Sequence, residues 1–291
     1  MKISRIILYL FIWILPEHLL FAQEPVIGTV VNATDGSPIA YANIGIVGRN
    51  IGTVSDEKGS FRLLLPGGFS SADAVLVFSS VGYLDLEVPV SDLMDQKTPN
   101  IQLKPYVHEI PEIRISKSEP KEVFYGNRSR ALMTFYNFYT IHDVFDDGLG
   151  RELGKVLKIG PDIKLLEFSF YINASRFKHV KFRMNLYDLS GPTPEKIPLE
   201  KDVLFDVNQQ KGKVHVDLEP YDIYLKGYEK IGVTIQWLQS ELDEGNNAFF
   251  SIPAGLIATK GALYRSKSEA IWEFPAVNLS MYLKALRYSA F

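Results

Sequence analysis

The stretch that decides the fold is Gly52-Thr53-Val54-Ser55-Asp56-Glu57-Lys58-Gly59-Ser60-Phe61. Asp56 is placed to accept hydrogen bonds from the backbone N–H groups of its own turn, and Gly59 can adopt a positive φ without a steric penalty. Phe61 then returns the chain to an apolar interior. The segment predicts a tight turn in which these three residues have structural roles. Calcium binding at Asp56 and Glu57 is disfavoured, because the spaced run of oxygen donors that a calcium loop requires is missing.

Short apolar runs lie on either side of this segment and are separated by turn residues about every ten positions. The runs are Val26 to Val31, Ile39 to Val47, Arg62 to Leu65 and Ala74 to Ser79. No sustained period of about 3.6 residues occurs among them, so short strands of a β-sandwich are predicted. Four further residues have structural explanations: a turn at Gly36 and Pro38, a bend at Gly82, and a ring with a polar tip at Tyr83.

Three motifs in this region resemble the carboxypeptidase regulatory-like domain. They are the opening segment Gly28 to Ile44, the hairpin Gly52 to Phe61, and the strand and turn Phe78-Ser79-Ser80-Val81-Gly82-Tyr83. The resemblance implies a seven-stranded, transthyretin-like sandwich over residues 24–105. It also implies an accessory module, of the kind found beside peptidases or at the start of TonB-dependent receptors.

The N-terminus predicts export. Lys2 and Arg5 precede an apolar stretch from Ile6 to Leu15, and Ala22 offers a small residue for cleavage, so residues 1–22 are interpreted as a signal peptide. The alternative is a retained membrane anchor, which an apolar run of about ten residues is too short to provide alone. No later segment reaches membrane-spanning length. We expect the periplasm, the outer membrane or the cell surface of a Gram-negative bacterium as the location.

Composition narrows the chemistry. The 291 residues are 46% hydrophobic and 22% charged, which is typical of a globular protein with a core. The formal net charge of −3 gives no electrostatic footprint for nucleic acid. The chain has no cysteine, which excludes disulfides, thiol catalysis and a lipoprotein anchor.

A proline-rich segment divides the chain. Residues 106–122 are interpreted as a linker, and residues 123–291 as a second β-sandwich of the jelly-roll or galactose-binding-like type. Lys178 to Tyr187 alternates between polar and apolar residues, as a half-exposed strand does. The aromatic-rich residues 123–140 are compatible with a short helix or with strands. A plug-and-barrel receptor is excluded, because about 170 residues are too few for the barrel.

No catalytic, metal or cofactor site is predicted. The pattern Gly148, Gly150 and Gly154 has the wrong spacing for a dinucleotide loop. The cluster of His142, Asp143, Asp146 and Asp147 is interpreted as a solvated loop. His179 and His215 could meet across adjacent strands, but alternation explains both as surface residues. Asp217, Glu219 and Asp222 are close in sequence, and their separation in space would decide whether they act as paired carboxylates.

Binding by aromatic side chains is the stronger prediction. Tyr224, Trp272, Tyr221 and Tyr264 lie near strand ends or in loops, where exposed rings beside polar groups form a platform for sugars. Trp237 ends an apolar strand and is predicted to be in the core.

Three functions remain open. The first is a non-catalytic exported module that recognises a glycan or a cell-envelope protein. The second is a structural accessory subunit of an outer-membrane receptor or secretion assembly, and the third is a hydrolase with a site in the second domain.

Overall fold

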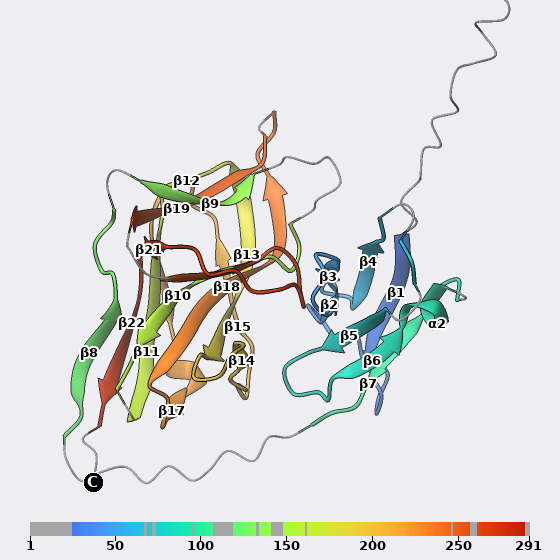
Figure 1. The fold of residues 1–291 in the computed structure, drawn as a ribbon, viewed down its shortest axis with the longest axis horizontal. Helices are drawn as coiled ribbons and strands as arrows, with labels where there is room; N and C mark the ends of the chain where they lie inside the picture. Colours follow the sequence, from blue (N-terminus) through green and yellow to red (C-terminus); the bar gives the residue numbers. More distant parts are fainter. Residues whose placement is uncertain are drawn as a thin grey trace, which may run out of the picture.

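The computed structural model describes residues 25–66, 69–71, 74–94, 96–106, 119–131, 134–140, 148–160, 162–245, 247–256 and 261–288. These residues form two bodies that lie side by side in Figure 1. The N-terminal sandwich comprises β1 to β7, and the C-terminal sandwich comprises β8 to β22. The two have separate hydrophobic cores.

The N-terminal sandwich consists of two small sheets. One has the order β4-β1-β7 and the other β3-β2-β5-β6, with a short helix, α2, following β6. Their bounds are β1 Pro25–Asn32, β2 Asn43–Ile46, β3 Gly52–Val54, β4 Ser60–Leu64, β5 Val75–Ser79, β6 Leu86–Pro89, α2 Val90–Met94 and β7 Asn100–Leu103. Apolar side chains from both sheets meet between them, and Phe61 packs edge-on against Phe78 with ring centroids 5.7 Å apart.

A tight turn is present between β3 and β4, but the implied hairpin is wrong, because β3 pairs with β2 and β4 pairs with β1 in the other sheet. The Asp56 carboxylate accepts hydrogen bonds from the backbone N–H groups of Lys58 and Ser60, both at 2.8 Å. Gly59 has a φ of 73°, and the position leaves no room for a side chain because a Cβ there would overlap the carbonyl oxygen of Val30. The turn therefore needs glycine for two independent reasons.

The C-terminal sandwich is built from three sheets. Their orders are β14-β13-β18-β10-β20 with β15 beside β13, β16-β11-β22-β8 with β17 beside β11, and β12-β19-β21 with β9 beside β19. The bounds are β8 Lys121–Gly126, β9 Phe135–Thr140, β10 Glu152–Lys158, β11 Asp162–Ile172, β12 Ala174–Ser175, β13 Phe177–Asp188, β14 Glu195–Lys196, β15 Val203–Val207, β16 Gly212–Asp217, η2 Glu219–Tyr221, β17 Tyr224–Lys226, β18 Lys230–Leu242, β19 Phe249–Leu256, β20 Ala262–Arg265, β21 Val277–Leu279 and β22 Met281–Arg287.

Aromatic rings fill the centre of the C-terminal sandwich. Trp237, predicted to be in the core, is fully buried. Its ring lies within 6 Å of five others, which belong to Phe138, Tyr139, Phe177, Phe182 and Phe250. Contacts between tilted aromatic rings stabilise a core beyond their buried area alone.

The prediction of an all-β protein is confirmed, since the described elements are strands apart from α2 and the 3₁₀ turn η2. The open choice at residues 123–140 is answered in favour of strands, β8 and β9. The transthyretin-like type of the N-terminal sandwich and the jelly-roll or galactose-binding-like type of the C-terminal sandwich stay predictions.

Residues 1–24 and 107–118 lie outside the described residues, so the predicted signal peptide and most of the predicted linker do too. The same is true of His142, Asp143, Asp146 and Asp147. Among the described residues, no helix has the length and apolar character needed to cross a membrane.

Candidate functional site

The two sandwiches are joined at the β2–β3 hairpin, which packs against the loop between β20 and β21. Gly45 and Gly52 face each other across the hairpin, and a Cβ on either would overlap the carbonyl oxygen of Ser268. The N–H of Gly48 donates to the carbonyl of Glu269 at 2.9 Å. The Ser266 hydroxyl donates to the Asn50 side chain at 2.8 Å. The close backbone approach explains why glycines occupy this hairpin.

A buried arginine forms a second connection between the sandwiches. Arg183 of β13 is 1% exposed and donates to the carbonyl oxygen of Tyr41 at 2.9 Å. Its guanidinium also pairs with Asp202 at 2.7 Å. Beside it, the Gln236 amide donates to the Asn43 side chain at 2.8 Å. Because these groups are buried and bonded to one another, separating the sandwiches would expose or unpair several of them.

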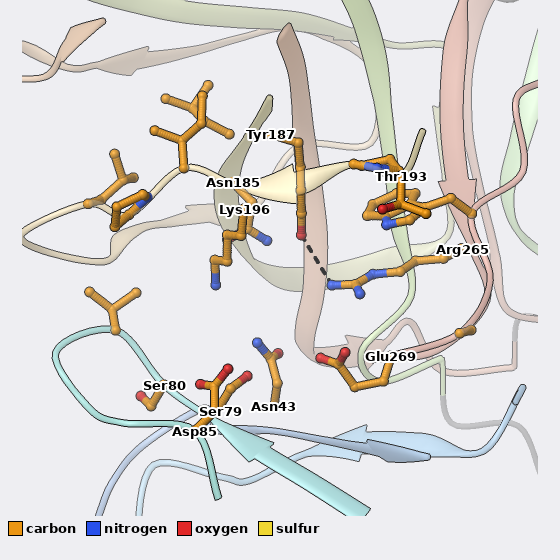
Figure 2. A pocket seen from close by; sticks show the side chains of 18 of the residues that line it. Asn43, Ser79, Ser80, Asp85, Asn185, Tyr187, Thr193, Lys196, Arg265 and Glu269 are labelled. Carbon is orange, nitrogen blue, oxygen red and sulfur yellow. Dashed lines mark hydrogen bonds between the residues drawn. The ribbon is translucent and has the colours of Figure 1, made fainter. Parts of the chain in front are cut away.

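A pocket of about 720 Å³ opens beside these contacts, between the two sandwiches. The N-terminal sandwich lines it with β2 and with the turn that follows β5, and the C-terminal sandwich lines it with β13, β14, β20 and the loops around them. Figure 2 shows the labelled side chains converging on this space from both sides. The residues that line the pocket include several with polar side chains: Asn43, Ser79, Ser80, Asp85, Asn185, Tyr187, Lys196, Arg265 and Glu269.

The wall of the pocket on the C-terminal sandwich contains a buried ion pair. The carboxylate of Glu152, which is 0% exposed, accepts from Arg265 Nε at 2.8 Å and from the Tyr187 hydroxyl at 2.9 Å. It also accepts from Asn185 at 2.8 Å and from the Thr234 hydroxyl. Burial alone would raise the pKa of Glu152, but Arg265 and these donors outweigh burial and lower it. Glu152 is therefore a fully bonded carboxylate that holds Arg265 in place.

Three other charged groups of the pocket are not paired in this way. Within the part of the chain that is described, the side chains of Lys196, Asp85 and Glu269 make no hydrogen bond or close ion pair. Asp85 and Lys196 keep exposed surface, yet the surrounding protein displaces part of their water. That loss of water raises the pKa of Asp85, although Lys196 partly opposes the shift. It lowers the pKa of Lys196, which the positive charge of Arg183 lowers further.

Glu269 has an unusual backbone conformation. Its φ is 63°, in the left-handed region that residues other than glycine rarely adopt. The hydrogen bond from Gly48 to its carbonyl and the contact between the hairpin and Ser268 hold the loop in this shape. Strained conformations of this kind persist where the surrounding structure over-determines them, and they cluster at functional sites.

Trp272 supplies an aromatic surface to the pocket. Its half-buried ring packs edge-on against Tyr187, with centroids 4.9 Å apart. The Arg265 guanidinium lies 4.7 Å from the centroid of the same ring. Trp272 is thus fixed in orientation by two residues that are themselves bonded to Glu152.

The four aromatic residues predicted as ligand contacts do not come together. Trp272 lines the pocket, whereas Tyr224, Tyr221 and Tyr264 do not. The Tyr224 ring in β17 lies below the ammonium of Lys164, and Tyr221 and Tyr264 pack against the core of the C-terminal sandwich. The four rings therefore do not share one surface, and ligand contact by any of them stays a prediction.

The other predicted candidates lie away from the pocket as well. His179 and His215 do not meet: they belong to different sheets, and they contact Asp206 and Glu167 respectively. Asp217 and Glu219 are exposed, and the Asp217 carboxylate accepts the backbone N–H of Glu219. Within the described ranges, no group of three or more histidine, aspartate or glutamate residues is placed to hold a metal ion.

The charged residues Asp85, Lys196 and Glu269 were missed by sequence reasoning. More than seventy positions separate each from the next along the chain, and only docking of the two sandwiches brings them together. One signal was available: Gly82 and Tyr83, identified as motif residues, lie in the turn that leads to Asp85, and both line the pocket.

Comparison with known proteins identifies the N-terminal part. Residues 26–115 match the CarboxypepD_reg-like domain family, which confirms the resemblance found in the sequence motifs of this segment. The chain is similar to the TonB-dependent receptor SusC of Bacteroides thetaiotaomicron, with 33% identity over 75 residues, which is 26% of this chain and 7% of that protein. It is also similar to the TonB-dependent receptor P39 of Formosa agariphila, with 32% identity over 110 residues, which is 38% of this chain and 9% of that protein. The aligned segments thus span less than a tenth of these receptors.

Solved structures show only distant likeness. The cysteine protease and lectin-like domains of Cwp84, a surface layer associated protein of Clostridium difficile, align over 55% of this chain and 37% of that chain, with 11% identity and a TM-score of 0.34. The major pilin subunit BcpA of Bacillus cereus aligns over 92% of this chain and 70% of that chain, with 10% identity and a TM-score of 0.20. Neither likeness carries a functional argument.

Proposed function

We propose that this chain is a non-catalytic binding module of the Gram-negative cell envelope, and that a saccharide occupies the pocket between its two sandwiches. The observation that carries the proposal is the lining of that pocket, where unpaired donors and unpaired acceptors flank one aromatic ring. The relatives named TonB-dependent receptors and the predicted signal peptide support the envelope location. We take residues 24–105 and 123–291 as the two domains.

The arrangement of donors and acceptors suits hydroxyl groups. Figure 2 shows Lys196 and Arg265 on one side of the space and Asp85 and Glu269 on the other. A hydroxyl group both donates and accepts, so one sugar hydroxyl can accept from an ammonium and donate to a carboxylate at the same time. A series of neighbouring hydroxyls would give the side chains of Lys196, Asp85 and Glu269 hydrogen-bond partners that the described part of the protein does not supply.

The aromatic surface suits the apolar face of a sugar ring. Ligand pockets usually combine aromatic side chains with a few polar groups that fix orientation, and Trp272 stands beside such groups here. Because Tyr187 and Arg265 already hold the Trp272 ring, a ligand would meet it without ordering it first. Such preorganisation lowers the entropic cost of binding.

A hydrolase is the second candidate, and one observation favours it. Asp85 has a raised pKa and Glu269 is a second carboxylate in the same pocket, and glycoside hydrolysis uses a protonated and an ionised carboxyl group. We favour binding without catalysis because the matched family is that of a regulatory domain. Prolonged incubation with any saccharide that binds separates the two: cleavage that is lost in both Asp85→Asn and Glu269→Gln would establish the hydrolase.

The proposal is tested by measuring the binding of the full chain to a panel of immobilised and soluble oligosaccharides. We expect Trp272→Ala to weaken binding by roughly tenfold, which corresponds to about 1.4 kcal/mol. Phe124→Ala is the matched control, because Phe124 is an exposed ring that lies in β8 and does not line the pocket. Absence of binding across the panel, or equal loss in both variants, would count against the proposal.

The alternative function, a structural accessory subunit, predicts a different result. If the chain instead serves as a structural subunit, membranes should yield a stable complex containing it, and Trp272→Ala should leave that complex intact. Recovery of such a complex together with no saccharide affinity would favour that function.

A further inference from the structure

We infer that the pocket selects against acidic saccharides and accepts uncharged ones. The inference rests on the proposed function and adds the chemical class of the ligand. It follows from counting which charges around the pocket are already neutralised inside the protein and which are left for a ligand to meet.

Two of the positive charges near the pocket are neutralised by carboxylates. Arg265 pairs with Glu152 at 2.7 Å and Arg183 pairs with Asp202 at 2.7 Å. Each guanidinium is at least nine-tenths buried and makes a further hydrogen bond, Arg183 to the Tyr41 carbonyl and Arg265 to the Tyr187 hydroxyl. A ligand carboxylate would have to compete with Glu152 or Asp202 for these cations, so neither pair offers a free positive charge.

The charges that remain are negative on balance. Asp85 and Glu269 are carboxylates without a close partner in the described chain, and Lys196 is the corresponding ammonium. Two carboxylates therefore face one cation across the space that a ligand would fill. The raised pKa of Asp85 reflects a setting that already disfavours negative charge.

A carboxylate on the ligand would lie close to this excess of negative charge. Repulsion between like charges in a partly dehydrated pocket is screened less than at an open surface. A neutral hydroxyl carries no such penalty and can donate to Asp85 or Glu269. Unfavourable placement of like charge is a common means of rejecting a wrong ligand, since specificity is a difference between two affinities.

The position of Glu269 is consistent with a selective role. The β2–β3 hairpin holds its backbone at a positive φ, so its place in the pocket is set by contacts between the sandwiches. Asp85 comes from the opposite sandwich. The two carboxylates thus come from different sandwiches, and docking of the sandwiches brings both to the same space.

The test uses matched pairs of ligands that share a backbone and carry either primary hydroxyls or carboxylates. Cellohexaose, mannohexaose and maltohexaose are each compared with a form whose primary hydroxyls have been oxidised to carboxylates. The full chain is titrated with every sugar at low salt by calorimetry. For any backbone that binds, we expect the oxidised form to bind at least tenfold more weakly.

The double variant Asp85→Asn, Glu269→Gln should reduce the ratio between the affinities for the neutral and the oxidised sugar to about threefold or less, even where the loss of two hydroxyl acceptors weakens both affinities. Glu195→Gln is the control, because Glu195 is an exposed carboxylate next to Lys196 that does not line the pocket. It should leave the tenfold difference unchanged. Thermal unfolding of each variant verifies that it remains folded.

The outcomes separate this inference from the proposed function. Equal binding of neutral and oxidised forms, tighter binding of the oxidised form, or a difference that persists in the double variant would overturn the charge selection and leave saccharide binding standing. Failure of every neutral and oxidised sugar to bind would remove the proposed function and the inference with it.

Discussion

The two sandwiches differ in what their sequences reveal. The N-terminal sandwich is identified by motifs whose residues make turns and fill the core: Asp56 bonds to its own turn, Gly59 takes a positive φ, and Phe61 packs against Phe78. The C-terminal sandwich has no such motif, and its core is an aromatic cluster around Trp237. Yet the C-terminal sandwich supplies Lys196, Glu269 and Trp272 to the pocket, against one charged residue, Asp85, from its neighbour.

The residues that identify a fold are therefore not necessarily the residues that bind a ligand. A turn motif persists in sequence because few residues satisfy its backbone, whereas a polar pocket between two bodies can be built from many combinations of residues. Here the recognisable sandwich also positions a residue of the other one, since its β2–β3 hairpin holds the loop that carries Glu269.

The largest expected effect is on the C-terminal core. Trp237→Ala should lower the free energy of unfolding of that sandwich by about 3–5 kcal/mol, because it leaves a cavity among five aromatic neighbours. Phe78→Ala, which removes a fully buried ring from the other core, is the counterpart. Hydrogen exchange measured strand by strand should show that each variant loses protection mainly in its own sandwich. Equal loss in both sandwiches from either variant would show that the two unfold as one unit.

The sequence predicted the N-terminal half well because alternation and turn chemistry are local. It predicted Trp237 in the core for the same reason, as the residue lies in a long apolar strand. Residues 123–140 stayed ambiguous, because adjacent aromatic residues such as Phe135 and Tyr136 produce no period. The alternative that His179 and His215 meet is wrong, because their strands belong to different sheets, which nothing in the sequence shows.

The charged residues of the pocket could not be predicted from the sequence, for a different reason. Trp272 was found because any aromatic residue in a loop is a candidate, and its ring does line the pocket. Asp85, Lys196 and Glu269 have ordinary neighbours in the chain. They acquire a common role only when the hairpin docks on the loop around Ser268, which is a long-range event without a local pattern.

The next effect concerns the contact between the sandwiches. Gly45→Ala places a Cβ against the Ser268 carbonyl. We expect this overlap to destabilise the docking of the hairpin on the loop by about 1–3 kcal/mol, so that the two separate. We expect a larger radius of gyration by small-angle X-ray scattering and weaker saccharide binding, with the secondary structure unchanged. Gly255→Ala is the control, because a Cβ at Gly255 meets nothing within 4 Å. A compact Gly45→Ala protein with full affinity would show that the docked hairpin is not needed for the site.

A smaller effect should distinguish the sandwiches in acid. Burial alone would raise the pKa of Glu167, but hydrogen bonds from Ser169 and Tyr282 and the contact with His215 lower it to about 2. A carboxyl group whose pKa is depressed in the folded state stabilises the fold above its ordinary value near 4.5 and loses that contribution as the pH falls towards 2. Since Glu167 is partly exposed, we expect roughly 1–2 kcal/mol from it.

Glu167→Gln should therefore flatten the decline in stability of the C-terminal sandwich between about pH 4.5 and 2, as measured by urea unfolding at each pH. Glu195→Gln removes an exposed carboxylate of the same sandwich and should leave the decline unchanged. An identical decline in the wild type and in Glu167→Gln would mean that other carboxylates govern the acid response.

The smallest expected effect is on ligand binding by the aromatic residues outside the pocket. Tyr224→Ala removes a ring that lies in β17 below the Lys164 ammonium, and this ring does not line the space between the sandwiches. Saccharide affinity should stay within about twofold of the wild type, in contrast to the roughly tenfold loss from Trp272→Ala. The two variants measured on one sugar by calorimetry compare an aromatic residue that lies in a single sandwich with one that faces both. A loss from Tyr224→Ala as large as that from Trp272→Ala would move the ligand site away from the pocket and onto the sheet that contains β11 and β17.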